Sequence, residues 1–210
     1  MEKTKKIQIS FDSCSKEEIL THAKSLEPFY THIYLGTAPL YKYGIDLIRD
    51  LRQELAQKKI ILKLKLADHV KEHAQIFSPL GVHSLSVTPC ITRIMLHAAA
   101  VAVHNQNIKL VLEMFDISYI NQSISDAKTV GIDAVLFHHI QDKENAQTLL
   151  EQVDFVRENT NVPIYLETSI TLDNLEEVIA ANPDALVLKE EIILEKNAEK
   201  ILQKIQDLLR

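Results

Sequence analysis

Short apolar runs alternate with longer amphipathic segments along the whole chain. The apolar runs have the length and the β-branched content of buried strands, and the segments between them have the period of helices that bury one face. Ser15 precedes one such segment with Glu18 three residues on, which predicts a capped helix start. The predicted strands are 6–11, 32–36, 59–66, 83–88, 108–115, 132–139, 163–168 and 184–189, each followed by a helix.

Eight strand–helix pairs at a spacing of roughly 25 residues predict a (β/α)₈ TIM barrel, because repeated right-handed crossovers close a parallel sheet. A doubly wound open sheet would usually need fewer pairs and a glycine-rich first turn, which FDSCS (11–15) is not. No Pro/Gly/Ser-rich linker interrupts the pattern. We therefore expect one barrel domain over residues 1–210.

The third predicted strand, KIILKLKL (59–66), carries two lysines in an otherwise apolar run. Lys63 and Lys65 share one face, and the leucines on either side of them share the other. The lysines either form an exposed strand face or point into the barrel. In an all-parallel barrel the leucines suit the helix-facing side, so we expect both lysines to point toward the C-terminal mouth, where barrel enzymes place their chemistry.

Polar groups also end several other predicted strands, and they are expected to meet at the same mouth. This set can be a catalytic array, or a self-satisfied ion network that fills the site, since buried charges must find partners. Of His138 and His139, one should face the interior. The strand-end residues are Asp12, Glu113, His138, Glu167 and Lys189.

Composition and charge narrow the class of protein. A chain of 210 residues that is 46% hydrophobic can bury a full core. The net charge of −6, without a separate basic cluster, argues against a nucleic-acid partner. The segment after MEKTKK is too short for a signal sequence, and no run approaches membrane length. Cys14 and Cys90 match no metal spacing. We expect a cytoplasmic protein with free thiols and no membrane partner.

The segment KLKLAD (63–68) resembles a motif of a known enzyme group. The 3-hexulose-6-phosphate synthase and 3-keto-L-gulonate-6-phosphate decarboxylase group, in the orotidine monophosphate decarboxylase superfamily, has an Asp-x-Lys-x-x-Asp motif on its third strand. Almost the whole chain is similar to that group, including FD (11–12), IYLGT (33–37) and FHH (137–139). The resemblance implies a TIM barrel that acts on keto-sugar phosphates through a metal-stabilised enediolate.

The sequence departs from this group at the implied metal and phosphate sites. Lys63 and Tyr34 stand where the resemblance places two magnesium ligands, so we expect no Mg²⁺ there and no other cofactor. The glycine-rich turns that grip phosphate after strands seven and eight are replaced by LETS (166–169) and LKEEI (188–192). Glu190 and Glu191 would repel a phosphate, with only Lys189 to offset them.

Two functions follow from these departures. One is a barrel that is inactive or strongly altered in the family reaction. The other is an active, metal-independent lyase or aldolase on a small carbonyl or sugar substrate, with Lys63 and Lys65 as a cationic clamp. The implied catalytic residues are Lys63, Lys65, Asp68 and His138, and the implied substrate-binding residues are Asp12, Glu113, Glu167 and Lys189.

The partners expected from the sequence are a sugar or sugar phosphate and a second copy of the chain. In the resembling group, the residue matching Asp68 reaches the neighbouring subunit's site. MLHAAAVAVH (95–104) is apolar nearly all round, which predicts a buried helix or a subunit interface. We therefore expect a two-fold homodimer.

Overall fold

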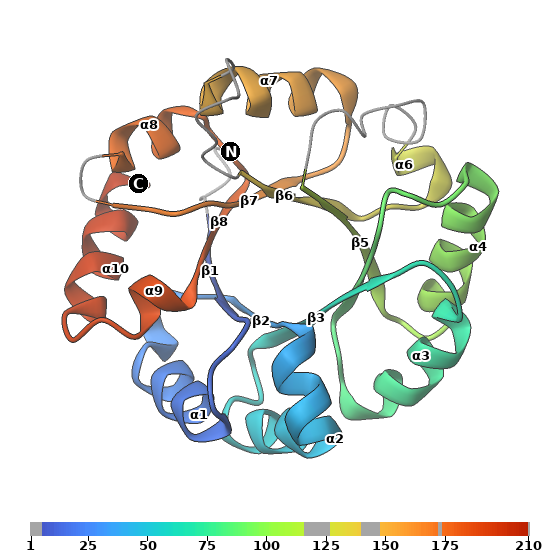
Figure 1. The fold of residues 1–210 in the computed structure, drawn as a ribbon, viewed down its shortest axis with the longest axis horizontal. Coiled ribbons are helices and arrows are strands. Elements are labelled where there is room, and N and C mark those ends of the chain that lie inside the picture. The colour runs from blue at the N-terminus through green and yellow to red at the C-terminus, as the bar shows by residue number, and fades with distance from the viewer. Residues whose placement is uncertain (1–5, 116–126, 140–147, 172–173, 210) are drawn as a thin grey trace.

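Eight parallel strands form a closed barrel in the order β1 to β8, with β8 paired to β1 (Figure 1). The computed structural model describes residues 6–115, 127–139, 148–171 and 174–209. The strands are β1 (Lys6–Phe11), β2 (His32–Leu35), β3 (Lys59–Leu66), β4 (Ser84–Val87), β5 (Lys109–Met114), β6 (Ala134–His138), β7 (Ile164–Glu167) and β8 (Ala185–Leu188). The (β/α)₈ fold and all eight predicted strands are confirmed, with ends that differ by at most two residues.

Helices surround the barrel as an outer layer (Figure 1). Ser15 caps the first of them in a capping box with Glu18, as predicted. The predicted helical residues 121–126, 143–147 and 172–173 lie outside the described ranges. The α-helices are α1 (Lys16–Ser25), α2 (Thr37–Glu54), α3 (Val70–Phe77), α4 (Arg93–His104), α6 (Ala127–Val130), α7 (Leu149–Asn159), α8 (Leu175–Ala180), α9 (Glu190–Ile193) and α10 (Ala198–Leu208), and the 3₁₀ turns are η1 (Glu27–Phe29) and η2 (Ser78–Leu80).

Two apolar cores follow from the alternation of side chains along the strands. The larger core lies between the strands and the helices and includes Leu62 and Leu66. The smaller core fills the barrel interior and includes Tyr34, Ile61 and Leu136. The predicted assignment of the β3 leucines to the helix side is therefore confirmed, and the opposite face of β3 points inward. In the described part of the chain, no helix is both long and apolar enough to span a bilayer.

Strand β3 contains an irregularity that strict alternation does not predict. Its pairing with β4 shifts between Leu62, opposite Leu85, and Leu66, opposite Val87. Between these two pairs β3 advances by four residues and β4 by only two, so β3 contains two extra residues here. Lys65 takes up the shift with a left-handed backbone (φ of 50°), a conformation that costs roughly 1–2 kcal/mol for a residue with a side chain. The second lysine is thus placed by a bulge rather than by a regular strand.

Candidate active site

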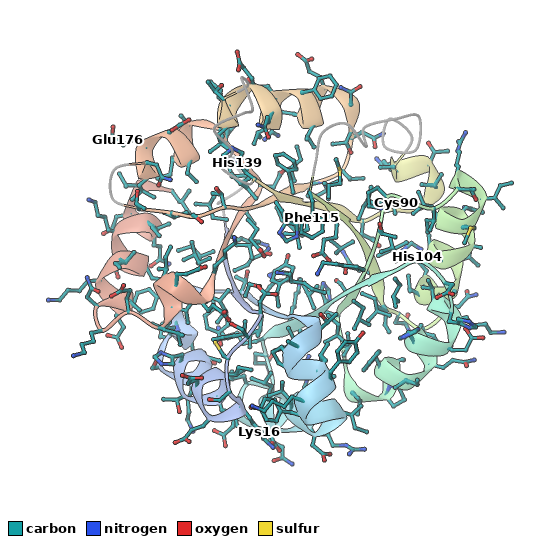
Figure 2. All side chains as sticks on the ribbon, in the orientation of Figure 1. Lys16, Cys90, His104, Phe115, His139 and Glu176 are labelled. Carbon is teal, nitrogen blue, oxygen red and sulfur yellow. The ribbon has the colours of Figure 1, made fainter. Side chains whose placement is uncertain are left out.

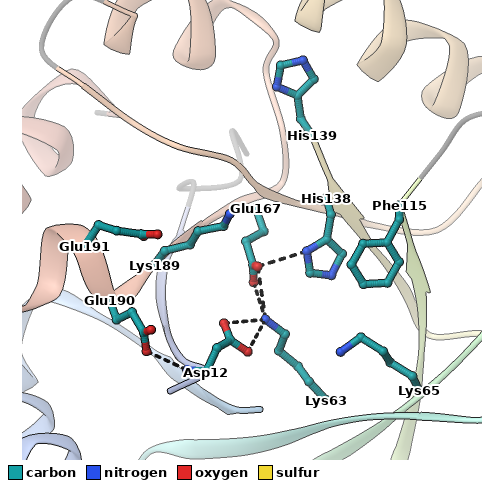
Figure 3. Close-up of a pocket in the computed structure, with 10 residues that line it drawn as sticks. All are labelled: Asp12, Lys63, Lys65, Phe115, His138, His139, Glu167, Lys189, Glu190 and Glu191. Atoms are coloured by element: carbon teal, nitrogen blue, oxygen red, sulfur yellow. Dashed lines mark hydrogen bonds and ion pairs between the residues drawn. The ribbon is translucent and has the colours of Figure 1, made fainter. Parts of the chain in front are cut away.

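The C-terminal ends of the strands surround a pocket of about 290 Å³ (Figure 3). This is the end at which barrel enzymes build their sites. Phe115, which follows β5, lies close to the centre of the ring of strands (Figure 2). The pocket is lined by Asp12, Lys63, Lys65, Phe115, His138, His139, Glu167, Lys189, Glu190 and Glu191.

Lys63 lies at the floor of this pocket with its ammonium group surrounded by acceptors. Its side chain is 2% exposed, and Nζ lies 2.9 and 3.0 Å from the two carboxylate oxygens of Asp12. Nζ also lies 3.0 and 3.1 Å from the oxygens of Glu167 and 3.1 Å from Ser10 Oγ. Burial opposes the charged form, but the Glu167 and Asp12 carboxylates outweigh it and raise the pKa of Lys63. Three acceptor groups match the three N–H donors of an ammonium group.

His138 connects Glu167 to a third carboxylate. Nδ1 lies 3.0 Å from Glu167 Oε1, and Nε2 lies 2.9 Å from Glu113 Oε1. With Glu113 and Glu167 ionised, each carboxylate can only accept a hydrogen bond, so both ring nitrogens act as donors and the ring is an imidazolium. Burial opposes this charge, yet the hydrogen bonds to Glu113 and Glu167 raise the pKa of His138. The ring of Phe115 stacks on the imidazolium with centroids 4.1 Å apart.

The two glutamates are correspondingly held as carboxylates. Burial favours their neutral forms, but the hydrogen bonds from His138 are the main opposing effect at both positions. With Lys63 adding its charge, the pKa of Glu167 falls to about 2. Glu113 also has a lowered pKa and accepts a 2.6 Å hydrogen bond from Ser86 Oγ. The buried floor of the pocket is therefore a charged network rather than a set of neutral acids.

Lys65 sits higher, at the wall of the pocket. Its Nζ lies 3.2 Å from Glu113 Oε1 and 5.5 Å from the centre of the Phe115 ring. Its backbone N–H donates to Ser86 Oγ at 2.9 Å, which fixes the bulge against β4. The side chain is 38% exposed, so the ammonium group retains access to the pocket. A closed ion network would hold both lysines largely out of solvent, and Lys65 departs from this because the bulge places it toward the rim.

The turn after β1 is tied to the turn after β8. The Glu190 carboxylate accepts from the backbone N–H groups of Asp12 and Ser13 at 2.9 Å, and from Cys14 Sγ at 3.1 Å. Gly36 lies against the same turn, where an added Cβ would be 2.5 Å from Asp12 Oδ1. These contacts fix the Asp12 side chain over the Lys63 ammonium.

The structure gathers most of the residues that the sequence indicated. Asp12, Lys63, Lys65, Glu113, His138 and Glu167 form one connected network. Among the described residues, the cations within ion-pair distance of these three acids are Lys63, Lys65 and His138. Lys189 lines the pocket at its rim.

Asp68 and Tyr34 lie away from the pocket of their own chain. The Asp68 side chain is 77% exposed on the turn after β3 and is absent from the pocket lining. Tyr34 is fully buried below the pocket, and its hydroxyl donates to Gln8 Oε1 at 2.5 Å. Sequence reasoning did not select Ser10, Ser86 or Phe115. The alternation that placed Lys63 inward would also have placed both serines inward.

The sequence of the chain is similar to those of a known protein family. Residues 5–200 match the Orotidine 5'-phosphate decarboxylase / HUMPS family. The chain belongs to this family. It is 20% identical over 184 residues to 3-hexulose-6-phosphate synthase from Bacillus subtilis (strain 168), which covers 87% of this chain and 88% of that protein.

Solved structures of the family share the fold. 3-Hexulose-6-phosphate synthase from Salmonella typhimurium superposes with a TM-score of 0.85 at 16% identity, over 97% of this chain and 98% of that one. 3-Keto-L-gulonate-6-phosphate decarboxylase from Vibrio cholerae also gives 0.85, at 13% identity, over 98% and 97% of the two chains. At these identities the likeness shows the fold, while the reaction has to be argued from the site.

Proposed function

We propose that this family member has lost, or strongly altered, the magnesium-dependent reaction of 3-hexulose-6-phosphate synthase, and that a fixed ammonium group stands in for the metal. The observation that supports this is the position of Lys63 Nζ, within 3.1 Å of both Asp12 and Glu167. A cation already lies among the carboxylates that would attract Mg²⁺.

The side chains at the two implied ligand positions do not fit a hard divalent cation. Mg²⁺ requires several oxygen ligands in near-octahedral geometry. Lys63 supplies a positive charge instead of an oxygen, and the Tyr34 hydroxyl is turned to Gln8 in the buried interior. No magnesium-dependent step is therefore assigned to this site.

The phosphate end of the pocket is also unsuited to a sugar phosphate. Lys189, Glu190 and Glu191 line it, and Glu190 itself occupies backbone N–H groups of the β1 turn. A pocket of about 290 Å³ lies at the small end of the range for ligand sites. We propose a small carbonyl compound without a phosphate group as the substrate.

The chemistry that these residues support is the formation of an enolate next to a carbonyl group. The three N–H donors of Lys63 are matched by Ser10, Asp12 and Glu167, so Lys63 contributes fixed charge. Lys65 keeps donor capacity toward the pocket and would donate to the developing enolate oxygen. Asp12, whose side chain is 38% exposed, would accept the proton from the α-carbon.

A catalytically silent barrel is the second candidate function. The closed network supports it, because three carboxylates are balanced by Lys63, Lys65 and His138 without a ligand. Such a network would hold the mouth together as a structural element.

Proton exchange in D₂O separates these candidates. Hydroxyacetone, a small ketone, and ribulose 5-phosphate are each followed by proton NMR with EDTA or with Mg²⁺. With the wild-type protein in EDTA, we expect hydroxyacetone to take up deuterium. The Lys65→Met variant should not catalyse this exchange. No exchange above the blank would favour the silent barrel. Robust Mg²⁺-dependent condensation of ribulose 5-phosphate with formaldehyde would contradict the proposed loss of the family reaction.

We also propose a two-fold homodimer. Helix α4 buries one face, and its other face exposes Ile94 (82%), Met95 and Val101. Asp68 lies exposed on the turn after β3, and α3 packs against α4. Ile94→Glu should shift the dimer to monomer in light scattering, whereas Lys204→Glu, an exposed change on α10, should not. A wild-type monomer at micromolar concentration would contradict the proposal.

A further inference from the structure

The N-terminal end of the barrel carries a cluster of positive charge. Lys6, Lys59 and Lys109 are the first residues of β1, β3 and β5. On β3, Lys59 is on the same strand face as the interior residues Ile61 and Lys63. Lys6 and Lys109 likewise occupy inward-facing alternate positions of β1 and β5. Three alternate strands therefore direct an ammonium group toward the lower opening of the barrel, opposite the candidate active site.

Two histidines lie within this cluster. His32 begins β2, His83 immediately precedes β4, and their ring centroids are 5.7 Å apart. Burial, followed by the charges of Lys59 and Lys109, lowers the pKa of His83 to about 4. Burial and the neighbouring ammonium groups of Lys6 and Lys109 also lower the pKa of Lys59. The lysines are thus close enough to disfavour the charged forms of Lys59 and His83.

A cavity of about 470 Å³ opens beside these residues, between the turns that precede β3, β4 and β5. Among the described residues that line it, none is acidic. The Arg52 guanidinium donates to the carbonyls of Ala56, Lys58 and Gly81, and its buried Nε has no hydrogen-bond partner in the described part of the chain. The lining residues are Arg52, Ala56, Gln57, Lys58, Lys59, Ser78, Gly81, Val82, His83, Gln106 and Asn107.

The carboxylate of Asp133, which interacts electrostatically with His83, already has other hydrogen-bond partners. Asp133 raises the His83 pKa only as a lesser effect behind burial and the lysines. Its Oδ2 lies 2.8 Å from His104 Nε2 and accepts from the Leu110 N–H at 2.8 Å. As far as the described residues go, the positive charge of the cluster is therefore left to be balanced by solvent ions or by a ligand.

We propose that this cavity binds a phosphate group, either as free phosphate or as a phosphate monoester, with Lys59 and His83 as direct donors and Lys6 and Lys109 adding charge. A dianionic oxyanion accepts several hydrogen bonds, and an ammonium group gives it a strong charge-assisted one. This site lies at the opposite end of the barrel from the pocket of the proposed function and does not depend on it.

Calorimetric titration with inorganic phosphate, and separately with glycerol 3-phosphate, tests the site at an ionic strength matched with NaCl. Binding of both ligands would indicate a monoester site, and binding of phosphate alone would indicate free phosphate. We expect Lys59→Gln, which removes a direct donor, to weaken affinity roughly tenfold. Lys109→Gln, which removes only a nearby charge, should weaken it by a smaller factor of roughly threefold. Lys204→Gln, which removes the same charge from exposed α10, should leave the affinity within about twofold.

In the titrations, two outcomes would overturn the proposal: no phosphate binding by the wild-type protein, or binding that Lys189→Gln weakens as much as Lys59→Gln. The second would place the anion at the other end of the barrel. Wild-type histidine NMR gives a readout that needs no stable variant. Phosphate should shift the ring Cε1–H signal of His83 and leave that of His138 in place, and the reverse pattern would also overturn the proposal.

Discussion

Replacing Lys63 and Lys65 separately with methionine tests how the charged mouth is held together. Both changes remove one ammonium group from the same strand, two residues apart, and keep a long apolar side chain. The structure predicts very different effects, because the Lys63 side chain is 2% exposed and that of Lys65 is 38% exposed.

Loss of Lys63 leaves the carboxylate of Glu167, 3% exposed, with His138 as its remaining charged partner. Removing one member of a buried ion pair costs about 3–5 kcal/mol, and the retained His138 favours the lower end. Asp12 adds little, because its side chain reaches solvent. At this chain length about 3 kcal/mol lowers the melting temperature by roughly 6–12 °C. Loss of Lys65 leaves Glu113 bound to His138 and Ser86, so about 1 kcal/mol or less is expected.

Urea unfolding and thermal melts of the two variants measure this difference. The double variant Lys63→Met/Glu167→Gln removes both charges and should recover about 1 kcal/mol or more relative to Lys63→Met. Equal stability of both single variants and the wild type would refute the buried network. A larger loss in Lys65→Met than in Lys63→Met would refute the assignment of Lys63 as its centre.

Three further predictions follow from the same site. Glu167 contributes stability that is present above pH 4.5, its ordinary pKa, and that is lost as the pH falls toward its lowered pKa of about 2. His138 contributes stability that is full below pH 6.5 and that is lost as the pH rises through its raised pKa. The stability difference between wild type and His138→Gln, measured by urea unfolding across pH, should therefore shrink above pH 6.5, and a difference that grows there would contradict it. Lys65→Gly should be about 1 kcal/mol more stable than Lys65→Ala in the same assay, because glycine tolerates the left-handed backbone; an order of Ala above Gly would argue against the bulge. Gly36→Ala should cost about 1–3 kcal/mol, since its Cβ would meet the Asp12 backbone and carboxylate, and an unchanged denaturation midpoint would show that the turn yields.

The fold could be predicted from the sequence because its signals are local and repeated. Each strand is a short apolar run, and each helix has its own period and, at Ser15, its own cap. Alternation along β3 was sufficient to place Lys63 inside and Leu62 and Leu66 outside. The strand ends then brought Asp12 and the network residues to one mouth.

The finer geometry of the site depends on contacts between distant segments, which no local pattern encodes. The bulge at Lys65 arises from a pairing shift between β3 and β4, so strict alternation does not predict the partial exposure of this side chain. The capture of the Glu190 carboxylate by the turn after β1 joins residues at opposite ends of the chain. The charge of His138 follows from two carboxylates on neighbouring strands rather than from its own sequence neighbours.

The proposed replacement of a metal by the Lys63 ammonium is tested most directly by the melting temperatures of the wild type and Lys63→Asp, each with and without saturating Mg²⁺. We expect no change on adding Mg²⁺ to the wild type, because an ammonium group already lies between Asp12 and Glu167. Lys63→Asp should melt lower without the metal, since it adds a carboxylate to two others, and Mg²⁺ should raise its midpoint by binding the folded state. A saturable rise in the wild-type midpoint with Mg²⁺ that Asp12→Asn abolishes would contradict the replacement.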